Sequence, residues 1–363
     1  MTKRPKFIRN WRELEPKEPV KPAIVDETFG FGTMLGAATD LTRLHISHVR
    51  LRGGERSNPP VASRDEEEFF FVLEGTPELW LEGHLYGLTE GDAVSLPDRT
   101  GAGRAILNNS KKDVRFFFLT EGSRYAARMF HPLAIDAKAN ENLQRMGKLW
   151  TDPPKRKRGP HDGLTDAKRG KPSPAGSHKK GKPPVAVHWK DILEEDKNSN
   201  YPGSMELHGI AARFGRKARL SQLGIHLDVL KPGRRTSWPH AERDEEEFVY
   251  VVSGKVDVWI DGHIFPAGEG DLIGFPSRTA ITHTIINNSD ADAILLVGAE
   301  APKARNQFFY PLHPKRNEEI GKDHWHDHPK VKLGPHDGLP DALRAQLKGA
   351  KKPAKKFSKK KRK

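Results

Sequence analysis

The stretch RDEEEFVYVVSGKVDVWIDGH, residues 243–263, decides the fold, because it repeats RDEEEFFFVLEGTPELWLEGH, residues 64–84. The offset of 179 residues persists in EGDAVSLPDRT and EGDLIGFPSRT, which begin at residues 90 and 269. It persists again where ILNNS matches IINNS. A constant offset over so long a span predicts an internal duplication in which each copy forms the same structural unit.

Each copy has the pattern of an all-β domain. In the second copy, short apolar stretches lie between residues 223 and 298, and turn-forming pairs such as Pro232-Gly233 and Asp261-Gly262 separate them. Many short strands at spacings of 8–12 residues are typical of a β-sandwich or barrel. The 33 glycines and 28 prolines of the chain fit the same interpretation.

The second copy also carries two motifs with polar residues at fixed spacing. The first motif begins at Gly233, continues through His240, Glu242 and Glu247, and ends at Gly254. The second motif combines Gly270 and Pro276 with His283 and, four residues later, Asn287. Both motifs resemble those of the cupins, a superfamily of double-stranded β-helix barrels, and the resemblance covers roughly residues 45–120 and 223–298. It implies two tandem jelly-roll barrels, a bicupin.

The resemblance also implies one divalent metal ion in the second barrel, held by His240, Glu242, Glu247 and His283. Residues two apart in a strand face the same side, so His240 and Glu242 can both point into a barrel. Glu242 replaces the second histidine of the usual His-x-His pair. Carboxylate in place of imidazole favours Mn or Fe, with Zn or Ni as alternatives. Glu242 is therefore a candidate for either a fourth ligand or a catalytic general base.

The first copy has lost most of these ligands. The positions equivalent to His240, Glu242, Glu247 and His283 are Val61, Ser63, Glu68 and Arg104. We expect Arg104 to pair with Glu68 and to fill the space that a metal would occupy. The first barrel is thus predicted to hold no metal and to act structurally or, alternatively, to bind an anion through Arg104.

The net charge of +14 is concentrated in two segments. Residues 347–363 carry +10 and residues 151–185 carry +7, which leaves the remainder slightly acidic. We expect an N-terminal barrel over 1–150, a basic flexible linker over 151–185 and a C-terminal barrel over 186–330. The last segment, 331–363, is expected to hold a second GPHDGL sequence and a disordered Lys-rich tail. Such a tail could bind nucleic acid or an acidic surface weakly, or serve only for solubility.

Three further patterns have simpler explanations. The acidic run before Glu68 and Glu247 is expected to be a solvated face. GPHDGL, at residues 159–164 and 334–339, is expected to be a turn that docks on its own barrel. HWHDH, residues 324–328, has metal-ligand spacing but no histidine counterpart in the first copy, so a second metal site there is disfavoured.

The function expected from these features is that of a small-molecule enzyme of the dioxygenase, decarboxylase or isomerase type, acting in the second barrel on an anionic or carbonyl-bearing metabolite. The alternatives are a non-catalytic sensor or binding module and a nucleic-acid-associated protein tethered by its basic tails. No cysteine is present, which excludes disulfides and thiolate metal sites. No apolar stretch reaches the length of a membrane helix, and we expect a cytoplasmic protein without a membrane partner.

Overall fold

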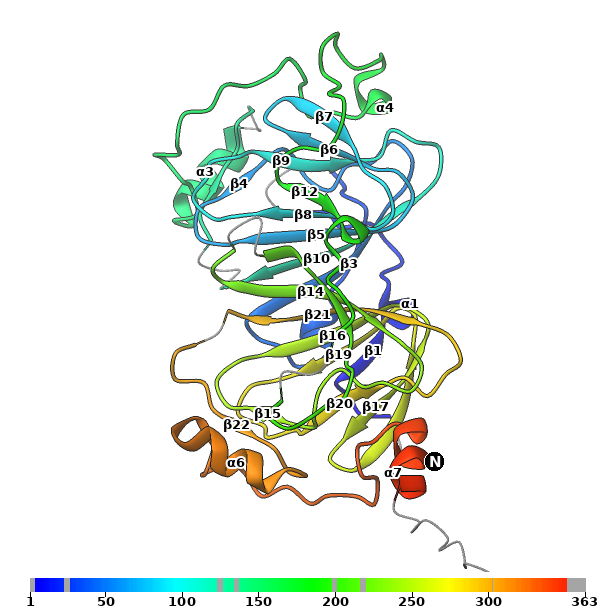
Figure 1. Ribbon diagram of the computed structural model, residues 1–363. Helices are drawn as coiled ribbons and strands as arrows, with labels where there is room; N and C mark the ends of the chain where they lie inside the picture. The colour runs from blue at the N-terminus through cyan, green and yellow to red at the C-terminus, as the bar shows by residue number, and fades with distance from the viewer. Residues whose placement is uncertain are drawn as a thin grey trace, which may run out of the picture.

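The computed structural model contains two β-barrels, one above the other in Figure 1, which pack through their large sheets. It describes residues 4–22, 27–122, 127–133, 137–197, 201–215, 220–301 and 303–350. Each barrel consists of a six-stranded sheet, a three-stranded sheet and a small two-stranded sheet. The all-β bicupin fold expected from the repeat is therefore confirmed.

The N-terminal barrel is built from three antiparallel sheets. The strands of its six-stranded sheet are, in spatial order, β12 (Ala186–His188), β8 (Asp92–Leu96), β5 (Glu68–Glu74), β10 (Val114–Glu121), β3 (Leu44–Leu51) and β2 (Phe31–Thr33). The three-stranded sheet contains β7 (His84–Gly87), β6 (Glu78–Leu81) and β9 (Arg104–Leu107). The short pair is β11 (Met129–Phe130) and β4 (Ala62–Ser63).

The C-terminal barrel repeats this arrangement. Its six-stranded sheet has the order β1 (Ile8–Asn10), β19 (Asp271–Phe275), β16 (Glu247–Ser253), β21 (Ala293–Glu300), β14 (Leu223–Leu230) and β13 (Ile210–Arg213). The three-stranded sheet contains β18 (His263–Gly268), β17 (Lys255–Ile260) and β20 (His283–Ile286). The short pair is β15 (Ala241–Glu242) and β22 (Phe308–Phe309).

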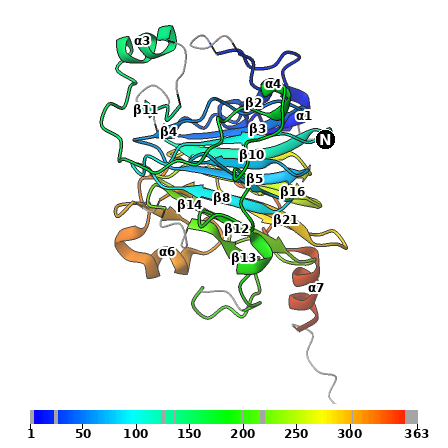
Figure 2. The same ribbon diagram turned by 90° about the horizontal axis from the view of Figure 1, so that it is seen from above.

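The helices are short. They are α1 (Trp11–Leu14), α2 (Leu35–Ala38), α3 (Ala137–Arg145), α4 (Asp166–Arg169), α6 (Pro314–Ile320) and α7 (Asp341–Ala350), with 3₁₀ turns η1 (Trp189–Ile192) and η2 (Gly321–Asp323). Of these, α2 contributes the buried Leu35 to the central layer between the two large sheets. In both views α3 lies on the N-terminal barrel, whereas α6 and α7 lie on the C-terminal barrel (Figures 1 and 2). None of the described helices is long and apolar enough to cross a membrane.

The two halves exchange edge strands. β1, at the start of the chain, pairs with β19 of the C-terminal barrel, with Ile8 opposite Ile273. β12, which follows residues 151–185, pairs with β8 of the N-terminal barrel, with Ala186 opposite Val94. The boundaries expected at residues 150 and 186 therefore describe the chain order, but each barrel borrows one strand from the other half.

The two six-stranded sheets pack face to face in the centre of the molecule (Figure 1). Alternation along β5 sends Phe69 and Phe71 into this layer, and Phe70 and Val72 into their own barrel. The ring of Phe117 lies 5.6 Å from that of Phe248 across the interface. Both faces of each large sheet are thus buried, which explains the nearly continuous apolar sequences of β5, β16 and β21.

The acidic run was expected to be a solvated face, and this expectation is wrong for Glu67 in the first half and Glu246 in the second. The side chains of Glu67 and Glu246 are each only 1% exposed. The Glu246 carboxylate accepts hydrogen bonds from three successive backbone N–H groups, residues 42–44, at 2.9–3.2 Å. Glu67 accepts equivalent bonds from residues 221–223 at 2.6–3.2 Å. Each carboxylate therefore joins its barrel to a strand of the other.

The predicted flexible linker is instead folded against the N-terminal barrel. His161, Thr165 and Ser177 are at most 1% exposed, and backbone hydrogen bonds connect residues 177 and 179 to Leu85. Basic composition alone misled the prediction, because the small and polar side chains between the lysines are the ones that dock. The lysines and arginines at residues 155–158 are exposed, as are those at 179 and 180.

GPHDGL docks on its own barrel in both halves, as expected. The indole N–H of Trp80 donates to the carbonyl of His161 at 3.1 Å, and that of Trp259 donates to the carbonyl of His336 at 2.9 Å. Only glycine permits this approach at residue 262, because a Cβ there would lie 2.4–2.7 Å from the backbone of Gly334. The beginning of the Lys-rich tail was expected to be disordered, but residues 347–350 form the end of α7. The remaining lysines lie outside the described residues.

Candidate metal centre

Three strands bring the candidate ligands together. His240 directly precedes β15, Glu247 begins β16, and His283 begins β20. The backbones of His240 and His283 pair with each other through N–H···O bonds of 2.9 and 3.2 Å. Two residues that are 43 positions apart are thereby fixed side by side at the inner wall of the barrel.

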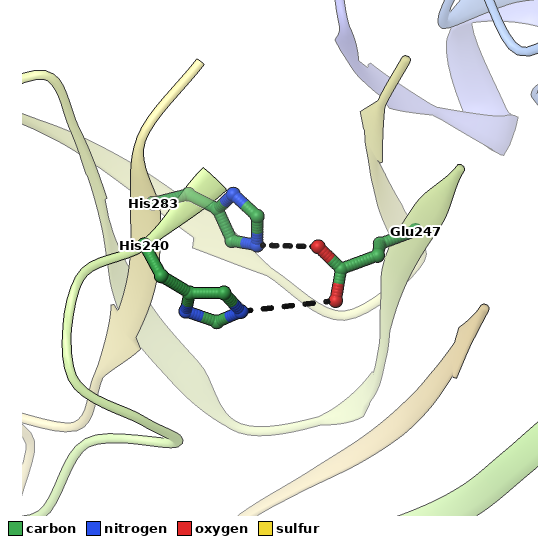
Figure 3. Close-up of side chains that lie close together, drawn as sticks. All are labelled: His240, Glu247 and His283. Atoms are coloured by element: carbon green, nitrogen blue, oxygen red, sulfur yellow. Dashed lines mark ion pairs between the residues drawn. The ribbon is translucent and has the colours of Figure 1, made fainter. Parts of the chain in front are cut away.

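The side chains of these residues converge on one point (Figure 3). The Nε2 atom of His283 lies 3.4 Å from one carboxylate oxygen of Glu247, and the Nε2 atom of His240 lies 4.0 Å from the other. One ligand atom from each residue lies within 4.8 Å of the other two. Three of the four predicted ligands therefore form a compact group with the spacing of a mononuclear site.

Backbone carbonyls orient both imidazole rings. The Nδ1 atom of His240 lies 2.9 Å from the carbonyl oxygen of Trp238, and that of His283 lies 3.1 Å from the carbonyl of Ile281. Because a carbonyl only accepts, each Nδ1 carries the proton and donates it. The lone pairs are left on the Nε2 atoms, which face Glu247. This is the outer hydrogen bonding typical of metal-bound histidines.

The protonation states also suit a cation. Burial lowers the pKa of His240 and so favours the neutral imidazole. Burial alone would raise the pKa of Glu247, but its interactions with His283 and His240 outweigh burial and lower that pKa. A neutral imidazole at His240 and an ionised carboxylate at Glu247 are the forms in which these side chains bind a metal ion.

Glu242 lies at the edge of this group. Its carboxylate is 4.0 Å from Nε2 of His240, and Asn306 donates a hydrogen bond of 2.6 Å to its other oxygen. Burial, followed by the charges of Glu247 and Glu245, raises its pKa well above the usual range. It is not one of the three converging residues, so its role as a ligand stays a prediction.

The first barrel contains an ion pair at the same place. The guanidinium of Arg104 donates to both carboxylate oxygens of Glu68 and, at 2.5 Å, to the carbonyl of Val61. Both side chains are only 8% exposed. The predicted Arg104–Glu68 pair is therefore present, and the guanidinium occupies the position of a candidate ligand in the second barrel. Ser63 stands at the position of Glu242, and its side chain is shorter than that of a glutamate.

The comparisons with known proteins agree with this duplicated architecture. The sequence model of the Cupin domain family matches residues 47–120 and, separately, residues 226–298. The chain belongs to the cupin superfamily. Because both halves match, it is a bicupin.

This bicupin is similar to several characterised proteins. It is 24% identical over 277 residues to quercetin 2,3-dioxygenase of Bacillus subtilis, covering 73% of this chain and 75% of that enzyme. It is 34% identical over 79 residues to polyketide synthase CurC of Streptomyces cyaneus, covering 21% of this chain and 49% of that protein. A structure of oxalate decarboxylase, from a study of proton-coupled electron transfer, superposes with a TM-score of 0.51 at 15% identity, covering 84% and 79% of the two chains.

A formate complex of Lactobacillus farciminis oxalate decarboxylase superposes on the bicupin with a TM-score of 0.50 at 15% identity, covering 89% of this chain and 96% of that one. At this level of identity, the structural matches support the shared fold alone. They extend over both barrels, so the tandem arrangement as well as the single barrel is common to these proteins.

Sequence reasoning missed several residues around the metal centre of the bicupin. Tyr310 stacks against His240, with ring centroids 5.8 Å apart, and Asn306 binds Glu242. Both follow the barrel strands and are brought back by the pairing of β22 with β15. His226 and Asp228, neighbours on one face of β14, form a further pair at 3.4 Å. The position of His226 and Asp228 on one face of a strand could have predicted that both point into the barrel.

HWHDH folds as a connector. Trp325 is buried, at 3% exposure, and packs in a small cluster with Ala241 and Ala280. The imidazoles of His324 and His326 lie 4.1 Å apart. Within the described ranges, His240, Glu247 and His283 are the only group of three or more potential ligands that meets the spacing of a metal site.

Proposed function

We propose that the protein is a metal-dependent enzyme whose C-terminal barrel holds one divalent ion on His240, Glu247 and His283. The observation that carries the proposal is the orientation of these groups: two Nε2 lone pairs and one carboxylate face a common point, while both Nδ1 atoms are held by backbone carbonyls. Three protein ligands leave coordination positions open for a small molecule. Mn or Fe suits this donor set best, with Zn or Ni as alternatives.

Among the expected reaction types, an oxygenase reaction is favoured. A facial set of two histidines and one carboxylate with open positions is characteristic of non-haem iron oxygenases. The relative from B. subtilis that matches most of the chain is a dioxygenase. The ion would bind and polarise a substrate oxygen and provide the redox or Lewis-acid chemistry. A small anionic or carbonyl-bearing metabolite is the substrate class that such a centre binds.

Glu242 is proposed as the general acid or base of this reaction. Its carboxylate lies beside the candidate ligands without being one of the three that converge. Asn306 donates to one oxygen and holds the side chain in place, and the other oxygen lies 4.0 Å from Nε2 of His240. A carboxylate in that position is within reach of a proton on a molecule bound at the open coordination positions.

Elemental analysis tests the metal site. We expect about one equivalent of metal in the purified protein and almost none in His240→Ala or His283→Ala, because two remaining ligands bind a divalent ion weakly. His326→Ala, an exposed histidine outside the centre, is the matched control and should keep its metal. Unchanged metal content in both ligand variants, with the fold intact, would show that the site is wrong.

Product analysis and oxygen consumption test the reaction. A panel of small carboxylates, ketones and phenols should contain a compound that the metal-loaded protein converts, and Glu242→Gln should slow that conversion by about 10²–10⁴-fold while keeping the metal. Saturable binding of a compound without any conversion would instead support the non-catalytic sensor. Retention on nucleic acid that disappears when residues 351–363 are removed would support the tethered alternative.

A further inference from the structure

The N-terminal barrel contains a cavity of about 420 Å³. Strands of the six-stranded sheet line most of it, together with Arg104 of β9 and the loop around Pro59. The exposed side chains of Val20 and Met34 also line it, so the cavity opens to solvent. Most of its walls are apolar, and the principal apolar side chains are Phe29, Val49, Val61, Phe70, Phe116 and Phe118. This volume falls within the range of small-molecule sites, and an apolar lining is typical of them.

The cation in this cavity is not available to an anion. Arg104 lines the cavity, but each of its guanidinium nitrogens already donates to Glu68 or to the carbonyl of Val61. An incoming carboxylate would have to compete with a buried carboxylate that is held by two hydrogen bonds. The geometry therefore disfavours the anion site that the sequence suggested and leaves a neutral cavity.

His131 provides the polar contact that remains open. Its Nδ1 lies 3.1 Å from the carbonyl oxygen of Pro60 and must donate to it. Its Nε2 is buried and has no hydrogen-bond partner in the described part of the chain. A buried acceptor of this kind is costly unless a ligand supplies a donor. Burial also lowers the pKa of this imidazole, which keeps it neutral.

We propose that the N-terminal barrel is a second, metal-free binding site for a neutral apolar molecule that carries a hydroxyl group. The apolar body would contact the phenylalanine-rich walls, and the hydroxyl would donate to Nε2 of His131. This site is separate from the metal centre, because the two lie in different barrels. His131 and Val61 of the N-terminal barrel stand at the positions of Tyr310 and His240 in the C-terminal barrel.

Binding of 1-naphthol to the full-length protein tests the proposal, with 1-methoxynaphthalene as the matched probe that lacks the donor. Calorimetry should show saturable binding of one 1-naphthol per chain and binding of 1-methoxynaphthalene that is about tenfold weaker, as expected for one buried hydrogen bond. This comparison uses only the wild-type protein. Absence of saturable 1-naphthol binding, or equal binding of the two probes, would overturn the proposal.

Variants locate the site. His131→Phe should weaken 1-naphthol about tenfold without changing 1-methoxynaphthalene, and Val49→Trp should weaken both probes by filling the cavity. Tyr310→Phe, at the equivalent position of the other barrel, is the control and should change neither. Naphthol binding that survives Val49→Trp in a folded protein would place the probe elsewhere and refute the assignment. Because no metal is involved, the same result is expected with His240→Ala, whatever the fate of the proposed enzyme.

Discussion

The two barrels have the same fold around different interiors. Glu68 and Glu247 occupy the same place at the start of matching strands, but a guanidinium neutralises the first, whereas two imidazoles face the second. The guanidinium of Arg104 compensates the charge of Glu68, and a bound cation would do the same for Glu247. The comparison teaches that a barrel of this kind requires compensation for its buried glutamate and tolerates either an arginine or a candidate metal centre as the source.

The faces that join the barrels differ much less. Glu67 and Glu246 make matching sets of hydrogen bonds to the opposite half, and the aromatic residues of β5 and β16 pack in the same central layer. Interface contacts have thus stayed alike in the two copies while the interiors diverged. The four predictions that follow test this contrast.

The largest effect is expected from converting the first interior into the second. Val61→His combined with Arg104→His restores two imidazoles opposite Glu68. If the interior residues alone account for the difference in metal binding between the barrels, metal content should rise from about one to about two equivalents per chain, as measured by elemental analysis. Val61→His alone is the control, because Arg104 still occupies the centre. A folded double variant with unchanged stoichiometry would show that the scaffolds differ as well.

Removing the compensating charge should destabilise the first barrel. Arg104→Leu leaves Glu68 buried without its partner, and we expect a loss of about 3–5 kcal/mol in the free energy of unfolding, measured in urea. Arg104→Leu combined with Glu68→Leu should recover most of this loss, since no charge is left unpaired. Equal destabilisation of the single and double variants would contradict the role assigned to the pair.

The interface carboxylates should respond alike. Glu246→Ala and Glu67→Ala each leave backbone N–H groups at the junction without acceptors, and each should cost about 2–3 kcal/mol of unfolding free energy. Glu269→Ala, which removes an exposed ion pair with Arg12, is the control and should cost less than about 1 kcal/mol. If Glu67 and Glu246 gave clearly unequal losses, the two halves of the interface would not be equivalent.

The smallest of these effects depends on pH and involves His48, whose equivalent in the other half is Leu227. Burial, reinforced by the charges of Arg115, Arg12 and Arg50, lowers the pKa of His48 to about 3. The unfolded chain therefore binds the proton more readily, so stability is complete above about pH 6.5 and declines as the pH falls towards 3. Between pH 7 and pH 5 the loss should be about 2 kcal/mol.

His48→Leu, which copies the other half, should remove this pH-dependent component. Thermal or urea unfolding at the two pH values measures it. The same slope in the variant and in the wild-type protein would assign the acid sensitivity to other groups.

Much of the architecture was predictable, because the 179-residue repeat and the spacing of the turns can be read from the sequence without knowing any tertiary contact. The three converging ligands were predictable from their spacing in the motifs. The burial of Glu67 and Glu246 was not, because it depends on backbone N–H groups supplied by the opposite barrel. Tyr310 and Asn306 were also missed, since only the pairing of β22 with β15 returns that segment to the centre.

The exchange of edge strands makes each barrel depend on a segment from the other half of the chain. Residues 8–10 complete the sheet of the opposite barrel, so cleavage or a bulky fusion near the start of the chain would expose an unpaired strand beside the candidate metal centre more than 230 positions away. Severing the polypeptide between its halves would likewise not release two self-sufficient pieces. Each fragment would carry the closing strand of the other, and the two would be recovered as folded protein only when produced together.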